Sequence, residues 1–376
     1  TGEVSTGFYP FSIDQSLRFN DNDSAYLRKQ NFSGSPTSDQ TCTFSAWVKL
    51  TQDGSRNAIY GSSTGSNAFT SLSFTSSGQV DLRSRNSSST DIIDVISNSL
   101  FRDTAWYHVM SVYDMTNSTR ADRAQIYING VRITDLSDDT LPNNTTTDFY
   151  NGDFISDMQI GRTNTNSSNN LYADFYLAEF HRVDGQALTP NSFGETKDGI
   201  FIPKNYTGSY GNHGFHLDFA DTSDIGKDVS GNGNDFTPNN LAASDVVPDS
   251  PTQNFATMNP LDKNSMTLAE GNLRPTPTGD YKGIRGNFAI PLTGKWFFEA
   301  RVTTGGGGNI TDQFIGIATD QNVLSGSSPY PQAATYGVLY KLAGTIGRLG
   351  SNAETGLASF AAGDVLGVAI NSTDNE

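Results

Sequence analysis

The clearest pattern of apolar and polar positions along the chain lies in the stretch AQIYINGVRIT, residues 124–134. Apolar residues alternate with polar ones on either side of an Asn129-Gly130 pair: Ile126, Ile128, Val131 and Ile133. Successive side chains of a strand point to opposite faces, so this spacing is typical of half-buried strands. An Asn-Gly pair between two such runs favours a type I′ turn. The stretch therefore predicts a β-hairpin.

Similar alternating or short apolar runs recur through the first half of the chain, separated by clusters of Gly, Asn, Asp and Ser. They lie at residues 16–20, 43–50, 69–84, 105–114, 157–162 and 176–183. No window there carries a helical period over three turns, so we expect very little helix. Short strands spaced by turn residues predict an all-β sandwich for residues 1–195.

The pattern changes twice after this first half. Seven prolines interrupt residues 196–280, which we interpret as a Pro-rich connector with one strand, GFHLDF, at 214–219. Strand-like runs then return at residues 295–303, 313–319, 334–341 and 364–371. They predict a second β-domain over residues 281–376.

Charge and composition narrow the range of functions. The 376 residues carry a formal net charge of −16, and 33 of the 40 acidic residues are Asp. This charge repels nucleic-acid phosphates, so no nucleic-acid partner is expected. Cys42 is the only cysteine, which excludes a disulfide framework. The chain has no apolar run of membrane-spanning length, so no membrane insertion is expected.

Four motifs follow one another in the first half: FSAWVK, WYHV, IYINGVRI and AEFHRVDGQALT. In this order they resemble the laminin G-like branch of the concanavalin A-like lectin and glucanase superfamily, over roughly residues 8–195. The resemblance implies a concanavalin A-like antiparallel jelly roll of two sheets. It also implies that Trp47 and Trp106 are core residues on inner strands, as their alternating neighbours indicate independently.

The second half carries GKWFFEARV at 294–302, FIGIAT at 314–319, YGV at 336–338 and GDVLGVAIN at 363–371. These motifs resemble a SPRY domain, whose fold is a bent β-sandwich used for binding. Such domains continue past the last of these strands with another hairpin. We therefore expect residues 281–376 to be a SPRY-like β-sandwich that is incomplete at its C-terminus, within a longer natural protein.

The order of a jelly roll, the stretch LDFADTSDIGKDVSGNGNDFTPNNL and a SPRY-like domain is similar to virion proteins of tailed phages, marine ones especially. The resemblance implies a non-enzymatic tail fibre, spike or capsid appendage located on the virion. The implied partners are a host cell-surface glycan or receptor, other virion proteins and further copies of this chain, in a trimer. Two alternatives stay open: a secreted bacterial adhesin or polysaccharide-binding module, and a carbohydrate-active enzyme that uses Asp residues.

A glucanase site requires two carboxylates on one face. Retaining enzymes of the superfamily that the chain resembles place them on one strand as E-x-D-x-x-E, because alternate side chains share a face. This string is absent, and Glu179 is the only Glu between Glu3 and Glu195. A Glu pair on a central strand is thereby excluded, whereas an Asp pair is not. We do not expect an enzyme.

The four histidines are weaker candidates for chemistry. His213 and His216 lie three apart in an extended segment, where they face opposite sides and share a metal only across a turn. His108 and His181 lie in strand-like runs, and we interpret them as sheet residues with satisfied hydrogen bonds.

Calcium is the metal that the composition favours, because Asp and Asn supply the oxygen ligands that a hard cation prefers. Laminin G-like relatives often hold calcium at one rim of the sandwich, which points to Asp21, Asp23 and Asp114. The stretch GKDVSGNGNDF, residues 226–236, also places Asp228 and Asn232 at spacings that resemble a calcium loop. It lacks the terminal Glu and the flanking helices of an EF-hand, so we interpret it as a turn, with calcium as the alternative.

Carbohydrate binding requires an aromatic face with amide or carboxylate groups for the hydroxyls. The long loops around residues 143–172 have this composition. The candidate ligand-binding residues are Tyr150, Asn164, Asn166, Asn170 and Tyr172.

Overall fold

The all-β expectation is confirmed. The computed structural model describes residues 8–51, 55–63, 68–143, 157–166, 169–279, 282–303, 314–318, 324, 337–348 and 351–373. These residues form β-strands joined by turns and by four short 3-10 helices: η1 (Asp21–Asp23), η2 (Arg120–Asp122), η3 (Pro190–Ser192) and η4 (Ala243–Asp245). Within these ranges no helix has the length and apolar character needed to cross a membrane. The chain divides into two compact units, Thr1–Phe255 and Ala256–Glu376.

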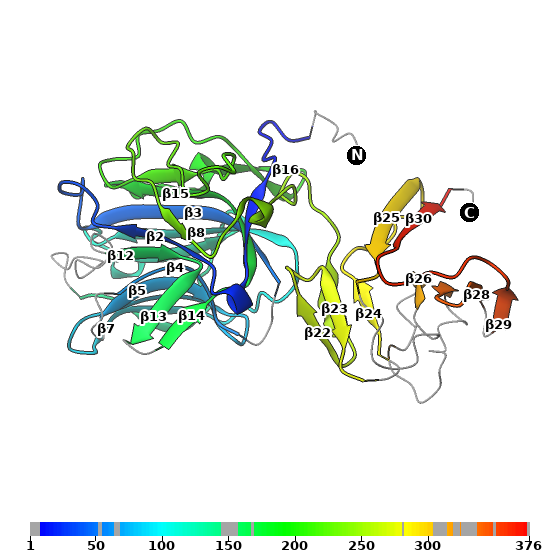
Figure 1. The fold of residues 1–376 in the computed structure, drawn as a ribbon. Coiled ribbons are helices and arrows are strands. Elements are labelled where there is room, and N and C mark those ends of the chain that lie inside the picture. Colours follow the sequence, from blue (N-terminus) through cyan, green and yellow to red (C-terminus); the bar gives the residue numbers. More distant parts are fainter. Residues whose placement is uncertain are drawn as a thin grey trace. The chain divides into compact units, whose positions relative to one another are not determined.

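The first unit is a sandwich of two antiparallel eight-stranded sheets, drawn from blue to green in Figure 1. Sheet A has the order β10-β9-β8-β3-β15-β1-β20, with β18 also paired to β15. Its strands are β1 (Ser16–Phe19), β3 (Thr41–Leu50), β8 (Trp106–Asp114), β9 (Ala124–Ile128), β10 (Val131–Arg132), β15 (Phe175–Asp184), β18 (Phe215–Leu217) and β20 (Val246–Val247). Sheet B has the order β11-β7-β6-β5-β4-β12-β2-β19. Its strands are β2 (Tyr26–Gln30), β4 (Asn57–Ser63), β5 (Phe69–Phe74), β6 (Val80–Arg85), β7 (Asp91–Ser97), β11 (Leu136–Thr140), β12 (Asp157–Ile160) and β19 (Thr237–Asn239).

The main core lies between these two sheets. Alternate residues of β3, such as Phe44 and Val48, meet residues of sheet B, and the Phe44 ring stacks on Tyr60 with centroids 4.3 Å apart. The expected hairpin is confirmed, with Ile128 paired to Val131 across the turn. Asn129 and Gly130 both have positive φ, 49° and 79°, as a type I′ turn requires.

Sheet A is buried on its outer face as well. The hairpin of β16 (Gly194–Lys197) and β17 (Ile200–Pro203) contributes Phe201 to a second apolar cluster with Trp47 and Trp106. Both tryptophans are buried, which confirms them as core residues. However, they alternate with residues of the main core and so point away from sheet B.

The expected connector is wrong for residues 196–255, because this segment belongs to the sandwich. Its strand β18 pairs with β15, β19 with β2, and β20 with β1, so the segment adds strands to both sheets. Phe215, Leu217 and Phe236 are buried in the main core. The boundary between the units therefore follows Phe255, instead of a boundary at residue 195 and a connector up to 280.

A buried ion pair ties the end of this segment to sheet A. Lys49 Nζ lies 2.7 Å from Asp249 Oδ2 and donates to Asn254 Oδ1 at 2.9 Å and to the Phe255 carbonyl at 2.8 Å. The indole of Trp106 donates to Asp249 Oδ1 at 3.0 Å. Burial lowers the pKa of Lys49, and the Asp249 carboxylate opposes this effect. The polar atoms of the pair are thus satisfied within the protein.

The second unit contains short antiparallel pairs. Strands β21 (Met258–Lys263) and β24 (Ile284–Gly286) pair, as do β22 (Met266–Ala269) with β23 (Arg274–Pro277) and β25 (Lys295–Arg301) with β30 (Val365–Asn371). A further sheet has the order β26 (Phe314–Ala318), β27 (Gly337–Lys341), β28 (Thr345–Arg348) and β29 (Ser351–Glu354). Trp296 and Phe297 are exposed on β25. The expected strands are present, and the SPRY-like architecture stays a prediction.

Candidate functional site

A two-stranded hairpin carries most of the candidate ligand-binding residues. It consists of β13 (Arg162–Asn166) and β14 (Asn169–Tyr172) and packs against β4 of sheet B. Gly61 of β4 permits this close approach, because a Cβ at that position would lie 2.7 Å from Thr163 Oγ1. The register places Arg162 opposite Tyr172 and Asn164 opposite Asn170. Figure 1 shows the hairpin next to β5.

The base of this hairpin combines aromatic, cationic and amide groups. The Arg162 guanidinium lies 4.7 Å from the ring centroid of Tyr26 and 5.4 Å from that of Tyr172. Arg162 also donates to Asn170 Oδ1 at 2.5 Å. Asn170 is exposed and the other three side chains are partly exposed. We call Tyr26, Arg162, Asn170 and Tyr172 the hairpin cluster.

The structure thus brings four of the five candidate ligand-binding residues onto one hairpin, Asn164, Asn166, Asn170 and Tyr172. The side chains of Asn164 and Asn166 lie outside the described residues, as does Tyr150 altogether. Tyr26 and Arg162 were not predicted. Tyr26 comes from β2, a strand that is distant in sequence, and the place of Arg162 beside two tyrosine rings is visible only in the folded chain. The contacts of the Arg162 guanidinium with both tyrosine rings therefore depend on the tertiary structure.

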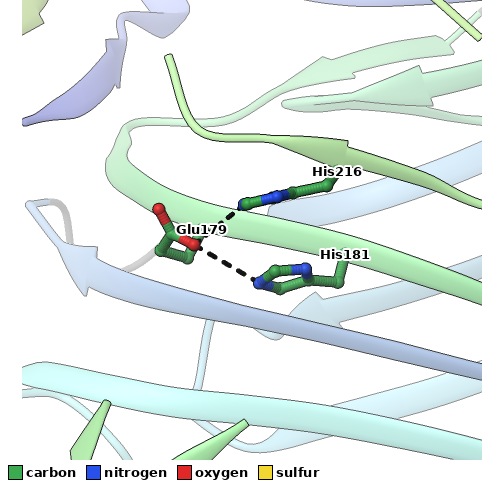
Figure 2. Close-up of side chains that lie close together, drawn as sticks. All are labelled: Glu179, His181 and His216. Carbon is green, nitrogen blue, oxygen red and sulfur yellow. Dashed lines mark hydrogen bonds and ion pairs between the residues drawn. The ribbon is translucent and has the colours of Figure 1, made fainter. Parts of the chain in front are cut away.

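A second group of functional side chains lies on the outer face of sheet A. Glu179 and His181 belong to β15, and His216 belongs to β18, directly opposite His181 in the strand register. Glu179 Oε2 lies 2.8 Å from His216 Nε2 and 3.5 Å from His181 Nε2. Figure 2 shows the carboxylate beside the Nε2 ends of both imidazole rings. We call these three residues the Glu-His-His group.

A β-bulge positions Glu179. The pairing of β15 with β3 shifts between Ala178 and His181, so that one residue is inserted into the strand. Glu179 itself adopts φ 49°, a left-handed conformation that a non-Gly residue rarely takes. Such a conformation costs free energy and is found where the surrounding structure fixes it. Here it accompanies a carboxylate directed at two imidazoles.

Aromatic side chains surround the Glu-His-His group. The rings of His181 and His216 stack with centroids 4.1 Å apart, and His181 Nδ1 lies 3.0 Å from the Tyr210 hydroxyl. Phe193 packs on His181 with a centroid distance of 5.1 Å. A narrow crevice reaches Glu179 and His181, and its other lining residues are Phe11, Ser45, Trp47, Phe193, Pro203 and Lys204.

Electrostatics keep the carboxylate of this group ionised. Burial raises the pKa of Glu179, but hydrogen bonds from His181 and His216 outweigh this effect and lower the pKa to about 2. Burial and the neighbouring His216 lower the pKa of His181 to about 4, against the opposing influence of Glu179. At neutral pH Glu179 is therefore a carboxylate and His181 a neutral imidazole.

His108 of β8 is buried next to this region. Its Nε2 lies 2.8 Å from Ser45 Oγ, and burial, together with His181, lowers its pKa to about 3. The hydrogen bond expected for this sheet histidine is thus made by its Nε2. No hydrogen-bond partner for its Nδ1 is found among the described residues.

We expect His108 to make the protein sensitive to acid. Its folded-state pKa lies below its unfolded value, so the unfolded chain takes up the proton first and stability falls from pH 6.5 towards 3. At pH 5 this costs about 2 kcal/mol relative to pH 7 or above. His108→Gln should reduce the acid-induced loss of unfolding free energy, measured by urea titration at pH 7 and 5. An equal loss in both proteins would contradict this assignment.

The candidate calcium residues of the N-terminal loop make local contacts. Asp21 and Asp23 form η1; Asp21 Oδ1 accepts a hydrogen bond from Asn22 Nδ2 at 2.9 Å, and Asp23 Oδ2 accepts one from Asn20 Nδ2 at 2.7 Å. Asp114 accepts hydrogen bonds from Thr116 and Asn117 in the turn that follows β8. Calcium at these residues stays a prediction.

The loop of residues 226–236 is held by its own side chains. Asp228 is buried and accepts hydrogen bonds from the backbone N–H groups of His216, Ser230 and Asn234, at 3.0, 2.9 and 2.8 Å. Asn232 Nδ2 donates to the carbonyls of Gly211 and Gly214, at 2.6 and 2.9 Å. These bonds account for a turn that fixes the start of β18, and therefore His216. Calcium at Asp228 and Asn232 stays a prediction.

Sequence reasoning missed the Glu-His-His group. It considered His213 with His216, but His213 Nε2 lies 3.1 Å from the Gly34 carbonyl, away from this group. The signal in the sequence was EFH, which places Glu179 and His181 two apart on a strand. The third member comes from β18 through a strand pairing that local spacing does not reveal.

A match to a known family model agrees with this architecture. Residues 20–192 match a laminin G-like family model described as the concanavalin A-like lectin/glucanases superfamily. The first unit contains a concanavalin A-like jelly roll. The family match ends before β18, so the third member of the Glu-His-His group lies beyond the matched residues of this jelly roll. No curated protein matches the chain.

Three solved structures that match part of the chain have low sequence identity and low TM-scores. A heptameric SAP-like pentraxin from Limulus polyphemus is 16% identical with a TM-score of 0.33, covering 47% of this chain and 78% of the pentraxin chain. The LG4-5 domains of the mouse laminin alpha1 chain are 12% identical with a TM-score of 0.34, covering 48% of this chain and 47% of that one. The CBM40 of the Ruminococcus gnavus IT-sialidase is 12% identical with a TM-score of 0.33, covering 48% of this chain and 96% of that one.

Proposed function

We propose that this protein is a non-enzymatic glycan-binding adhesion protein, and that the hairpin cluster contacts the glycan. The observation that carries the proposal is the combination of Tyr26, Arg162, Asn170 and Tyr172 at the surface of a lectin-like sandwich. Sugar rings pack their apolar faces on aromatic side chains, while amides and guanidinium groups bind hydroxyls or carboxylates. The hairpin cluster offers both kinds of contact.

Binding without hydrolysis is supported by the surroundings of Glu179. Its carboxylate is engaged with two histidines, and the sequence lacks the E-x-D-x-x-E string that would place two carboxylates on one face of a strand. A retaining glycosidase requires two carboxyl groups about 5 Å apart. Incubating the protein with the glycans it binds should therefore release no shortened products, as measured by mass spectrometry.

We further propose that the protein acts on a virion, as part of a tail fibre, spike or capsid appendage that attaches to a host-surface glycan. The support is the order of sequence motifs over both halves of the chain. In this role it contacts other virion proteins and further copies of itself, in a trimer. Peptides of the chain should be found by mass spectrometry in purified particles, and their absence would contradict this location.

Tyr172→Ala should weaken glycan binding at least tenfold, a loss of about 1.4 kcal/mol. The change removes an aromatic face and one of the two rings that hold the Arg162 guanidinium. The measurement is calorimetric titration of the full chain with an oligosaccharide selected on a glycan array of neutral and acidic sugars.

The control for Tyr172→Ala is Phe288→Ala, which removes an exposed aromatic side chain in the second unit and should leave the affinity unchanged. Circular dichroism should show that both variants are folded. Equal affinity of Tyr172→Ala and the unaltered protein would place the glycan elsewhere. Failure of the unaltered protein to bind any glycan would overturn the proposed function.

A further inference from the structure

We propose that Glu179, His181 and His216 form a binding site for a divalent transition metal, with Zn²⁺ as the best fit. The three donor atoms lie within 4.8 Å of one another. Two imidazole nitrogens and one carboxylate oxygen are a ligand set that Zn²⁺ takes in proteins. Calcium fits less well, because it prefers six to eight oxygen ligands.

The strand geometry holds the donors ready for one ion. His181 and His216 lie directly opposite each other on adjacent antiparallel strands, where facing side chains come close together. The bulge and the left-handed backbone of Glu179 bring its carboxylate to the Nε2 ends of both rings, as Figure 2 shows. The left-handed conformation is costly, and a shared metal ligand explains why this chain retains it.

Neighbouring groups fix the orientation of the ligands. When a metal occupies Nε2, the single N–H of neutral His181 moves to Nδ1, which lies 3.0 Å from the Tyr210 hydroxyl that can accept it. Asp228 Oδ1 accepts the backbone N–H of His216 and so fixes the strand that carries this ligand. The side chain of His216 is 14% exposed, so solvent reaches the group. Three protein donors leave one position of a tetrahedral ion for a water molecule.

The metal would join two parts of the first unit. Glu179 and His181 belong to the matched jelly roll, whereas His216 belongs to the segment that follows it. A bound ion therefore cross-links β15 and β18 in addition to their backbone hydrogen bonds. The site is independent of glycan binding, because the hairpin cluster packs on sheet B and the Glu-His-His group lies on the outer face of sheet A.

The test is metal uptake by the purified full chain after dialysis against EDTA and then against ZnCl₂. We expect one Zn²⁺ per chain by plasma mass spectrometry. Because a ligand of the folded state alone stabilises that state, Zn²⁺ at 100 times its dissociation constant should raise the melting temperature of the first unit by roughly 5 to 10 °C. His216→Gln should lose both effects.

The matched control is His213→Gln, which changes a histidine three residues away that faces the Gly34 carbonyl. It should bind Zn²⁺ like the unaltered chain. Because His216→Gln could fail to fold, Co²⁺ added to the unaltered chain gives a second readout, the visible absorption of a four-coordinate ion. A chain that stays metal-free and gives no such absorption would overturn the proposal, as would full Zn²⁺ uptake by folded His216→Gln.

Discussion

A chain that ends at Glu195 should fail to fold, whereas a chain that ends at Phe255 should unfold cooperatively. The shorter chain lacks strands β18, β19 and β20, which pair with β15, β2 and β1. It also loses buried apolar side chains of the main core: Phe215, Leu217, Phe219, Ile225 and Phe236. Each contributes about 1.5–3 kcal/mol by burial, so their combined loss is comparable to the whole net stability of a typical domain, about 5–15 kcal/mol.

Thermal unfolding followed by circular dichroism, together with the dispersion of amide signals in NMR spectra, separates the two chains. The chain ending at Phe255 provides the control, because the first compact unit ends at that residue. A cooperative transition for the chain ending at Glu195, near that of the longer chain, would show that residues 196–255 are dispensable.

Lys49→Met should destabilise the first unit by about 3–5 kcal/mol, because it leaves the buried Asp249 carboxylate without its cation. The substitution also removes hydrogen bonds to Asn254 and to the Phe255 carbonyl, which anchor the end of the unit. Denaturant titration of the full chain gives the free energy of unfolding. The transition of the first unit is expected to move to lower denaturant concentration.

Lys227→Met is the matched control, since Lys227 and Asp224 are 3.9 Å apart with both side chains about half exposed. Exposed pairs contribute about 0–1 kcal/mol, so this variant should unfold close to the unaltered protein. If Lys49→Met is as stable as Lys227→Met, the buried pair does not anchor residues 249–255.

The strands could be predicted because alternation and turn residues are local signals. The hairpin around Asn129-Gly130 is found at the expected residues, with both turn residues at positive φ. The role of residues 196–255 could not be predicted, because their prolines suggested an irregular connector. Pro203 and Pro238 in fact lie in short strands, β17 and β19. β18 joins β15, and β19 joins β2. Burial of Phe215 and Phe236 in the main core favours these pairings, which connect segments that are far apart in the sequence.

The candidate site could also be predicted only in part from the sequence. The composition of the long loops around residues 143–172 pointed to Tyr150, Asn164, Asn166, Asn170 and Tyr172. Tyr26 lies beside Tyr172 but belongs to β2, and it comes close only through the strand order of sheet B. His213 lies in a turn before β18 instead of on an extended strand, so the rule that residues three apart on a strand face opposite sides does not apply to it; its Nε2 lies near the Gly34 carbonyl, away from His216. Local sequence patterns could not identify His181 as the partner of His216. That pairing depends on β15, a strand earlier in the chain, and on the bulge at Glu179.

The most direct test of the central claim is to map a bound glycan onto the protein by NMR. The full chain, labelled with ¹⁵N, is titrated with an oligosaccharide that the glycan array selects. Glycan binding at the hairpin cluster predicts that the largest shift changes occur at Tyr26, Arg162, Asn170 and Tyr172, with β8 and β9 of sheet A unaffected. Shift changes confined to sheet A or to the second unit, with none at the hairpin cluster, would contradict the account.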